Sequence, residues 1–297
     1  MSRPPGIPRG ARKTHQQGSD FWVVGDRPAR LRDAYHSFLK LRWSLSLLLI
    51  GVVFFLSNLL FAIVYYLIGG VDGMREGSFM DALSFSVETM ATVGYGAMHP
   101  QSTGAHLTMI VESITGIIVT ALATGLIFAK FSRPTTRIAF SAKATITKHE
   151  GKRSLVFRLG NRRGNVIVEA TLHVVAVTTT TTAEGSTFYR AQDLELVRDR
   201  QVGMTRGWTV MHVIDGSSPL WGIDNPEALK KVDIEIYVAL TGIDDITAQT
   251  IHSIHRYAHD EIKVDHHLAD TLSILPNGEF VIDLSKFDEV IPDNFAA

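Results

Sequence analysis

The strongest constraint on the fold of this chain is an uncharged run of 24 residues, from Leu45 to Ile68. An α-helix of that length reaches about 36 Å, and the hydrocarbon core of a bilayer is about 30 Å thick. A second stretch, from Leu107 to Phe131, has 17 uncharged residues between Glu112 and Lys130. A buried helix of a soluble protein is the alternative for each stretch, but such runs are rare in soluble folds. The sequence therefore predicts two membrane spans, at 45–68 and 107–131.

The overall composition excludes several kinds of site. The chain has 297 residues and no cysteine, which excludes disulfide scaffolds, thiolate zinc sites, iron–sulfur clusters and cysteine nucleophiles. The formal net charge is −1, which gives no support for general binding of nucleic acid. The length is about twice that of a typical domain, which predicts two structural units.

The distribution of basic residues predicts the orientation of the two spans. The first 44 residues contain nine lysines and arginines against three acids, whereas the segment between the spans has a single base, Arg75. Lysine and arginine are enriched on the cytoplasmic side of membrane proteins. We therefore expect both termini, and the 166 residues after Phe131, in the cytoplasm.

The segment between the spans predicts a re-entrant loop. Residues 69–77 are polar and glycine-rich, and Ser78 is a suitable N-cap for a short amphipathic helix over 79–90. This helix is too short to cross the bilayer, so the chain must enter the membrane and return. The irregular backbone that follows is tolerated at membrane depth only where protein or water surrounds it.

That backbone is Thr92-Val93-Gly94-Tyr95-Gly96, which resembles the selectivity filter of potassium channels. In such a filter carbonyl oxygens replace the hydration shell of the ion, and glycine permits the unusual backbone angles. The resemblance implies K⁺ ions held at Thr92, Val93, Gly94 and Tyr95, with no cofactor. Because four such loops are needed to surround an ion, it also implies a homotetramer. We expect Glu88, which precedes the filter, to support it by a hydrogen bond from behind.

The second span is predicted to line the inner pore. Five residues spaced three and four apart share one helical face: Ser113, Ile117, Thr120, Thr124 and Phe128. Four copies of Phe128 would close a hydrophobic constriction; the alternative is an aromatic side chain that faces lipid or another helix. Gly116 and Gly125 are hinge candidates, with simple helix packing as the alternative. Glu112 is an intramembrane acid that we expect near the cavity or between subunits, with a purely structural hydrogen bond as the alternative.

The rest of the chain predicts a second, β-rich domain. Ser132-Arg133-Pro134 ends the second span, and a linker runs to Arg137. Short segments rich in β-branched residues then alternate with turns, which favours a β-sandwich of immunoglobulin-like type. The expected strands are 143–147, 155–159, 166–182, 193–198, 209–213, 232–240 and 280–284. No G-x-G-x-x-G sequence occurs, which disfavours a nucleotide-binding domain of Rossmann type.

Several stretches resemble the inward-rectifier potassium channels, especially their prokaryotic branch. The longest is 208–220, which fits the family pattern W-x-x-x-H-x-I-D-x-x-S-P-L; the others are 86–89, 132–134 and 247–249 with 260–262. The resemblance covers roughly 30–290 and implies a tetrameric cytoplasmic vestibule continuous with the pore. Eukaryotic members carry a cysteine pair around the pore loop and a base after the filter. This chain has neither, which favours a prokaryotic channel of the cell (inner) membrane.

The resemblance also implies an interfacial slide helix before the first span. Residues 30–42 fit it, because apolar side chains share a face beside basic ones. Anionic lipids or phosphoinositides should gather at the bases near the inner leaflet, unless those charges only set the topology. The lipid candidates are Arg30, Arg32, Lys40, Arg42, Lys130, Arg133 and Arg137.

Two further points concern regulation. Strong rectifiers of the family carry an acid on the pore face of the second span, which attracts blocking Mg²⁺ or polyamines. Thr120 occupies that position and is neutral, which implies weak rectification; Ba²⁺ is a further expected blocker. His252, His255 and His259 are spaced three and four apart. Metal binding, pH sensing and ordinary surface histidines stay open for them, although strand and turn would break the helical spacing.

These inferences divide the chain into a flexible cytoplasmic N-terminus (1–29), the slide helix (30–42), the pore domain (43–132), a linker (133–137) and the β-sandwich (138–297). The predicted function is a potassium-selective inward-rectifier-type channel, gated at the inner helix bundle. The alternative is another two-span potassium channel gated by a soluble ligand at its cytoplasmic domain. A membrane-tethered enzyme is disfavoured because no H-E-x-x-H, G-x-S-x-G or P-loop pattern occurs.

Overall fold

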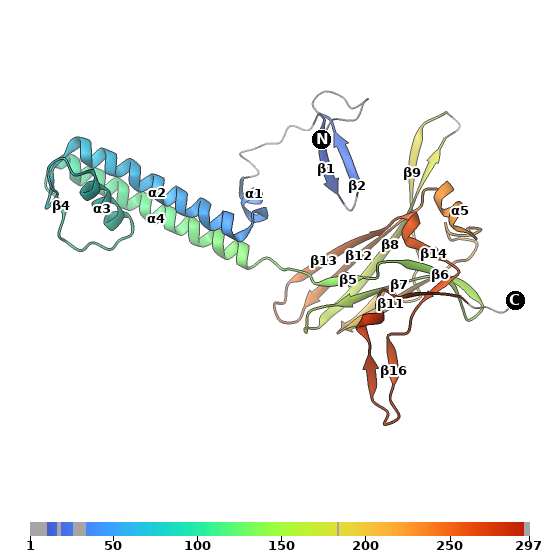
Figure 1. The fold of residues 1–297 in the computed structure, drawn as a ribbon. Helices are drawn as coiled ribbons and strands as arrows, with labels where there is room; N and C mark the ends of the chain where they lie inside the picture. The colour runs from blue at the N-terminus through green and yellow to red at the C-terminus, as the bar shows by residue number, and fades with distance from the viewer. Residues whose placement is uncertain (1–10, 17–18, 26–33, 183, 294–297) are drawn as a thin grey trace. The chain divides into compact units, whose positions relative to one another are not determined.

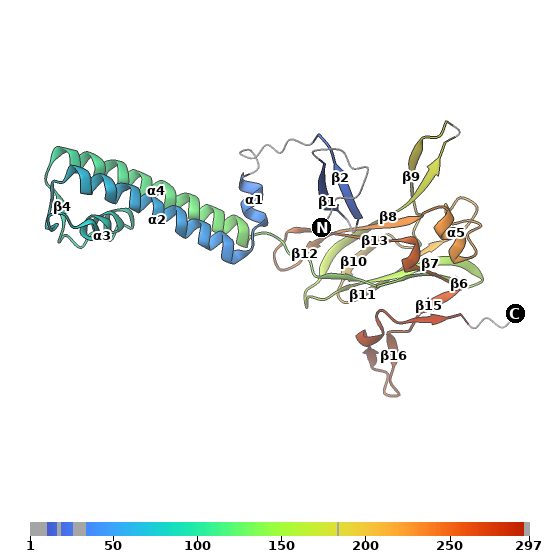
Figure 2. The same cartoon turned by 45° about the horizontal axis from the view of Figure 1, so that its top comes forward.

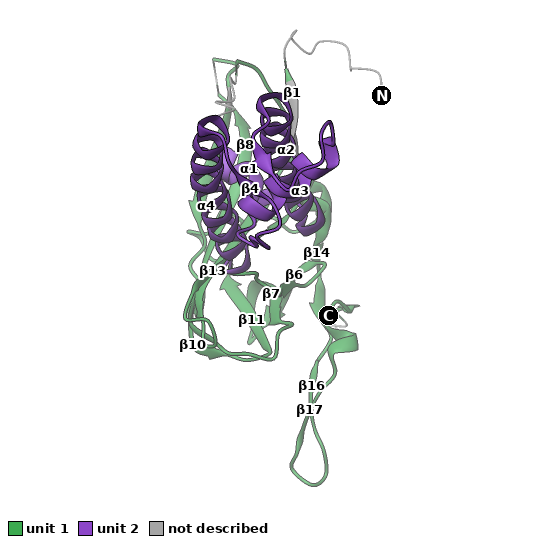
Figure 3. Ribbon diagram, turned by 90° about the vertical axis from the view of Figure 1, so that its left-hand side faces the viewer, with its two compact units in different colours: residues 1–25, 134–297 green, residues 26–133 purple. Residues whose placement is uncertain are grey.

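The structure is a computed structural model that describes residues 11–16, 19–25, 34–182 and 184–293. The chain divides into two compact units (Figure 3). The membrane unit contains residues 26–133, and the β unit contains residues 1–25 and 134–297. Each unit is described by itself.

Two long apolar helices form the frame of the membrane unit. Helices α2 (Trp43–Ile68) and α4 (Thr103–Phe131) are both long and apolar enough to cross a membrane, and they lie side by side (Figures 1 and 2). Both begin before the predicted spans, because a helix starts at its cap and not at the membrane edge. The hydroxyl of Ser102 caps α4 by accepting a hydrogen bond from the amide of Ala105 at 3.1 Å.

Two shorter helices pack on this pair. Helix α3 (Phe79–Met90) occupies the range expected for the pore helix and is capped by Ser78, whose hydroxyl accepts the amide of Asp81 at 3.2 Å. Helix α1 (Ala34–Lys40) contacts α4 and is shorter than the expected slide helix. It ends at Lys40, and α2 begins after the non-helical residues 41 and 42. The lipid candidates Arg30 and Arg32 lie outside the described residues.

A pair of short strands closes the re-entrant segment at its base. Strands β3 (Val71–Asp72) and β4 (His99–Pro100) pair antiparallel, which joins the chain before α3 to the chain after the filter sequence. Gly73 lies beside this junction with φ 78°, and a Cβ there would meet the carbonyl oxygen of Ala97 at 2.1 Å. Only glycine fits this position.

The β unit contains a sandwich of two five-stranded sheets (Figures 1 and 2). In one sheet the order is β10-β8-β12-β13, with β9 paired to β8; in the other it is β11-β7-β6-β14, with β5 paired to β7. The first sheet consists of β8 (Ile167–Thr181), β9 (Thr187–Asp193), β10 (Arg200–Met204), β12 (Glu235–Asp244) and β13 (Thr250–Tyr257). The second consists of β5 (Ile138–Phe140), β6 (Ala144–His149), β7 (Lys152–Asn161), β11 (Gly207–Val213) and β14 (Ile262–Val264).

The hydrophobic core lies between these sheets and follows from the period-two pattern of the strands. In β8 the buried side chains alternate with exposed or half-buried ones over 172–176. Leu155, Phe157 and Leu159 on β7 point into the core and are fully buried, although the residues between them on this strand are buried as well. The prediction of a two-span membrane part followed by a β-sandwich is therefore confirmed.

The remaining elements of the β unit are short. Strands β1 (Arg12–Gln16) and β2 (Ser19–Val23) form a hairpin, which differs from the flexible segment predicted there. Helix α5 (Pro226–Lys231) and the 3₁₀ helix η1 (His259–Glu261) flank β12 and β13 in sequence. The last elements are β15 (His266–Leu268), β16 (Leu272–Ile274), β17 (Phe280–Ile282), η2 (Leu284–Lys286) and β18 (Val290–Pro292).

One predicted strand is wrong. Residues 194–199 are irregular, because β9 ends at Asp193 and β10 begins only at Arg200. Isolated backbone bonds replace a ladder there: the amide of Leu194 donates to Val174 and that of Val197 donates to Met211. The segment therefore joins two strands of the first sheet and hydrogen-bonds to one strand of each sheet. The alternation of apolar residues over 193–198 reflects the burial of Leu194 and does not indicate a strand.

Candidate functional site

Backbone hydrogen bonds attach the filter sequence to the C-terminal end of α3. The carbonyl oxygen of Glu88 accepts the amides of Val93 at 2.8 Å and Gly94 at 3.3 Å, and that of Thr89 accepts the amide of Thr92 at 3.1 Å. The first residues of the loop are therefore held to the last turn of the helix. Any displacement of α3 moves the loop with it.

The backbone of this loop alternates between two conformations. Thr92, Gly94 and Gly96 have φ values of 57°, 53° and 80°, whereas Val93 and Tyr95 between them are not left-handed. With this alternation of backbone conformations, successive carbonyl groups can point to the same side of the chain. Thr92 is β-branched and lacks the conformational freedom of glycine, so its positive φ costs about 1–3 kcal/mol.

The support from Glu88 comes through its backbone. Its side chain is half-buried, and no hydrogen bond to its carboxyl group is present among the described residues. Val93 and Tyr95 are 50% and 78% exposed in the single chain. The loop is thus attached to its own subunit mainly along one edge.

Glu112 makes buried hydrogen bonds, as in the alternative interpretation of its sequence position. Its side chain is fully buried inside the membrane unit, among α2, α3 and α4. The hydroxyls of Tyr65 and Ser86 both donate to its carboxyl group. This polar cluster behind the filter was missed as a unit, because its members come from three separate helices.

The five predicted pore-lining residues share an open face of α4. Ile117, Thr120, Thr124 and Phe128 are exposed and Ser113 is half-buried. The face that packs inside the subunit is a different one, made by Ala105, Glu112, Gly116 and Lys130. Gly116 packs closely on α3, since a Cβ there would lie 2.8 Å from the carbonyl oxygen of Met90, whereas Gly125 has open space around it.

The basic residues near the end of α4 fall into two groups. Lys40, Arg42, Arg133 and Arg137 are exposed. Lys130 is only 8% exposed, and its ammonium group donates to the carbonyl oxygens of Leu41 at 2.5 Å and Leu39 at 3.4 Å. It also lies over the rings of Phe38 and Trp43. The geometry therefore assigns Lys130 to the junction of α1 and α2, and not to an open basic surface.

The signature stretch 208–220 has a structural explanation. His212 is buried and bonds at Nδ1 to the carbonyl oxygen of Glu195, 2.7 Å away, and at Nε2 to the hydroxyl of Ser218, 2.8 Å away. Trp208 and Leu220 lie in the core. These contacts fix the loop after β11, so the motif identifies the fold without carrying chemistry.

The three histidines do not form one face. His252 and His255 lie on β13 and His259 lies on η1, so the helical spacing does not apply. His255 stacks on Phe140 with ring centroids 4.9 Å apart, and burial lowers its pKa. No metal-binding cluster of histidine and acidic side chains is present in the described parts of the chain.

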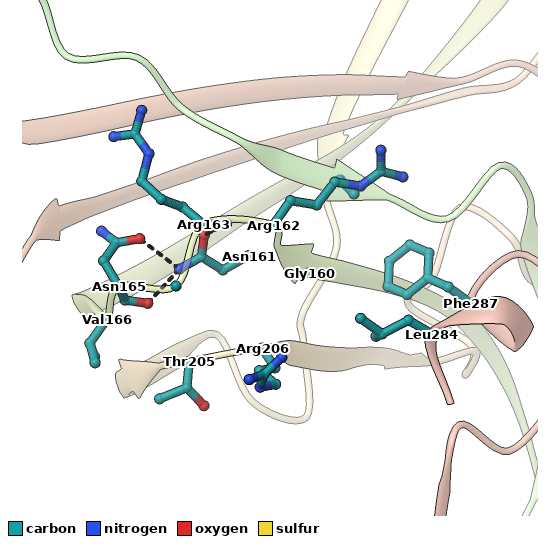
Figure 4. A pocket seen from close by; sticks show the side chains of 12 residues that line it. Gly160, Asn161, Arg162, Arg163, Asn165, Val166, Thr205, Arg206, Leu284 and Phe287 are labelled. Atoms are coloured by element: carbon teal, nitrogen blue, oxygen red, sulfur yellow. Dashed lines mark hydrogen bonds between the residues drawn. The ribbon is translucent and has the colours of Figure 1, made fainter. Parts of the chain in front are cut away.

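The β unit also has an open cavity of about 710 Å³ that the sequence analysis missed (Figure 4). Arg162, Arg163 and Arg206 line it together with Leu284 and Phe287. Arg163 is engaged, since it bonds to the hydroxyl of Thr135 at 2.6 Å and lies 3.6 Å from Asp244. Arg162 and Arg163 point away from one another in Figure 4, so the guanidinium groups do not converge on one point.

Comparison with known proteins gives a consistent result for both units. A family model described as "Inward rectifier potassium channel transmembrane domain" matches residues 22–134, and one described as "Inward rectifier potassium channel C-terminal domain" matches residues 138–295. The inward rectifier potassium channel Kirbac3.1 of Paramagnetospirillum magnetotacticum is 40% identical over 261 residues, which are 88% of each chain. ATP-sensitive inward rectifier potassium channel 12 of Gallus gallus is 30% identical and is matched over 94% of this chain and 70% of its own length.

These relatives are channels and not enzymes, and the matches cover the membrane helices, the filter loop and the β-sandwich alike. The chain therefore belongs to the inward rectifier potassium channel family, as a member of its prokaryotic type.

Proposed function

We propose that four copies of this chain form a K⁺-selective channel in the cell (inner) membrane, with both termini in the cytoplasm. K⁺ moves through it down its electrochemical gradient. The observation that carries the proposal is the loop Thr92–Gly96, with its alternating left-handed backbone, attached to a re-entrant helix between two membrane-spanning helices. Carbonyl oxygens of Thr92, Val93, Gly94 and Tyr95 then coordinate dehydrated K⁺.

The homotetramer follows from what one subunit lacks. One loop supplies carbonyl groups on one side of an ion only, and an ion without its hydration shell needs ligands all around it. The exposed side chains of Val93 and Tyr95 suit packing against neighbouring copies, because large apolar side chains at membrane depth need protein or lipid contact. Closed fourfold symmetry satisfies both needs with one chain.

The gate is proposed at the cytoplasmic end of α4. Phe128 is 69% exposed on the face that also carries Ile117, Thr120 and Thr124. Four phenyl rings that converge on the axis exclude water and therefore ions, which is the principle of a hydrophobic gate. Gly125, one turn earlier and free of close neighbours, is the remaining hinge candidate.

Regulation by anionic lipids or phosphoinositides is proposed through the exposed bases Lys40, Arg42, Arg133 and Arg137. Each base near an anionic leaflet contributes about 1 kcal/mol of attraction. Weak rectification is proposed because Thr120 offers no charge to Mg²⁺ or polyamines in the pore.

Flux measurements on reconstituted protein test the proposal. Liposomes with an outward K⁺ gradient should take up rubidium, and external Ba²⁺ should block the uptake. Sodium-only controls should show no flux, and varying the phosphoinositide content should change the rubidium rate. Equal sodium and rubidium fluxes would refute the assignment of the filter.

A further inference from the structure

A closed polar cluster lies behind the filter, in the interior of the membrane unit. The carboxyl group of Glu112 on α4 accepts the phenol of Tyr65 on α2 at 2.7 Å and the hydroxyl of Ser86 on α3 at 2.5 Å. All three side chains have no exposed surface. The two carboxyl oxygens thus have one donor each, from two different helices. An acid at this depth is costly unless its hydrogen-bonding groups are satisfied.

The cluster continues to the end of α3. The Ser86 hydroxyl has one proton, and its contact to Glu112 is shorter than those to the backbone and side-chain oxygens of Asn58, at 3.0 and 3.2 Å. The amide group of Asn58 in turn donates to the sulfur of Met90 at 3.2 Å and to the carbonyl oxygen of Phe54 at 2.8 Å. α2 therefore holds α3 at Ser86 and at Met90.

Helix α4 holds the same two points of α3. Glu112 bonds to Ser86, and Gly116, one turn later, lies so close to Met90 that a Cβ would be 2.8 Å from the Met90 carbonyl oxygen. Both pairs are four residues apart, so they lie on matching faces of the two helices. The hydrogen bond sets the position of α3 along α4, and the glycine sets the distance between them.

The filter is attached directly to the held part of α3. The carbonyl group of Glu88, which accepts the amides of Val93 and Gly94, lies between Ser86 and Met90 on the helix. A shift of Ser86 relative to α4 is therefore passed to the loop by backbone bonds. Selectivity depends on carbonyl positions, so small shifts here have consequences for ion binding.

We propose that Glu112 is a positioning residue for the selectivity filter, acting through its hydrogen bond to Ser86 on the pore helix. It fixes the carbonyl groups of the filter from behind without touching the ion. The proposal rests on the proposed function, because it assigns Glu112 to the same K⁺ site. Its role is carried by hydrogen bonding: a side chain that replaces both bonds should replace Glu112.

The test compares four substitutions in full-length protein in liposomes. Glu112→Met keeps the volume and removes the hydrogen bonds, Ser86→Ala removes the partner, and Glu112→Gln keeps one acceptor and adds a donor. Thr115→Val is the matched control, because the Thr115 hydroxyl bonds to the carbonyl oxygen of Val111 on its own helix. The readouts are the rubidium-to-sodium flux ratio and block by Ba²⁺, which binds in the filter. Block by tetrabutylammonium from the cytoplasmic side, in the cavity, reports general damage.

Loss of the hydrogen bond should lower the flux ratio and weaken Ba²⁺ block about tenfold in Glu112→Met and Ser86→Ala, the effect of losing one buried hydrogen bond. Their double variant should show the same loss of selectivity, since each single variant already removes the Ser86–Glu112 hydrogen bond. Glu112→Gln and Thr115→Val should stay within about twofold of the wild type, and tetrabutylammonium block should not change. A normal flux ratio and normal Ba²⁺ block in assembled Glu112→Met would overturn the proposal.

Hydrogen exchange separates this proposal from the proposed function. Amides of residues 86–94 should exchange faster in Glu112→Met than in the wild type, whereas amides of α2 should not change. This readout does not depend on conduction. A non-selective wild type would therefore refute the filter assignment, while unchanged exchange in the variant would refute the role of Glu112. If Glu112→Met does not assemble, Ser86→Ala and Tyr65→Phe give the same comparison.

Discussion

At the scale of single residues, the two glycines of α4 differ in a way that their sequence context does not reveal. Both interrupt an apolar helix, but Gly116 touches the backbone of Met90 and Gly125 has nothing within 4 Å in its own subunit. Ala is the better helix former by about 1 kcal/mol. Where the space beside the glycine is open, alanine should stabilise the helix. Where a backbone atom occupies that space, the steric strain should exceed this gain in stability.

We therefore predict opposite effects for Gly116→Ala and Gly125→Ala. Gly116→Ala should destabilise the protein by about 1–3 kcal/mol, because a rigid backbone atom opposes the added methyl group. Gly125→Ala should leave stability unchanged or slightly raised. Thermal unfolding of the purified protein in detergent measures both. Equal losses in the two variants would contradict the packing role of Gly116.

The histidine at position 255 predicts a pH dependence of stability. Burial lowers the pKa of His255 below its ordinary value near 6.5; the charge of Glu261 raises it by less, and the charge of Arg256 lowers it further. Because the unfolded chain then takes up the proton first as the pH falls, His255 favours the folded state above pH 6.5 and loses that contribution below it. His255→Phe keeps the stack on Phe140 and removes the titration.

We expect the melting temperature of the wild type to fall more between pH 7.5 and 5.0 than that of His255→Phe. His252→Phe is the control, since His252 is exposed on the same strand. Melting curves of the full-length protein at the two pH values give the comparison. An equal fall in the wild type and His255→Phe would show that other groups set the acid response.

At the scale of elements, the sequence predicts whether a segment is a helix or a strand better than it predicts the residues at which the element begins and ends. The uncharged runs identify both spans, but the helices begin earlier, at Trp43 and Thr103, and the start of α4 is set by the Ser102 cap and not by hydropathy. The strand expected at 193–198 is absent because Leu194 is buried by an irregular connection between β9 and β10, two strands of one sheet. The cluster around Glu112 could not be predicted, because helix pairing decides which of several polar residues meet.

At the junction of α1 with α4, the cation of a single side chain, Lys130, holds the end of α1. Lys130 donates to carbonyl groups at the C-terminal end of α1, where the helix leaves them without partners. The guanidinium group of Arg133 adds a bond to the Leu39 carbonyl oxygen at 2.8 Å. Position 130 thus couples the end of α1 to the end of α4.

We predict that Lys130→Met releases α1 from this junction. The charge-assisted bonds are lost, each of which contributes about 1.5–3 kcal/mol, while the apolar stem is kept. The chain has no natural cysteine, so Ser37→Cys places a single spin label on the exposed side of α1. Its mobility should rise in Lys130→Met and stay unchanged in the control Lys40→Met, whose side chain is exposed. Equal mobility in both would show that Lys130 does not hold the helix.

At the scale of the whole molecule, the filter and the gate are separable predictions of one fourfold pore. The filter depends on backbone geometry at Thr92–Gly96, whereas the gate depends on the bulk of one side chain at the opposite end of α4. Substitutions in the filter and at the gate should therefore cause different defects. A change at position 128 should alter how often ions pass and leave the choice of ion unaltered, because no carbonyl of the filter moves with it.

We expect Phe128→Ala to raise the rate of rubidium uptake several-fold, since four small side chains no longer exclude water from the constriction. The rubidium-to-sodium ratio and the tetrameric mass of the purified protein should match the wild type. Ile127→Ala is the control, because Ile127 is the neighbouring apolar residue about 100° around the helix. A raised rate in both variants would point to general loosening of α4. An unchanged rate in Phe128→Ala alone would place the closed gate elsewhere, with the filter itself as the next position to test by Ba²⁺ protection.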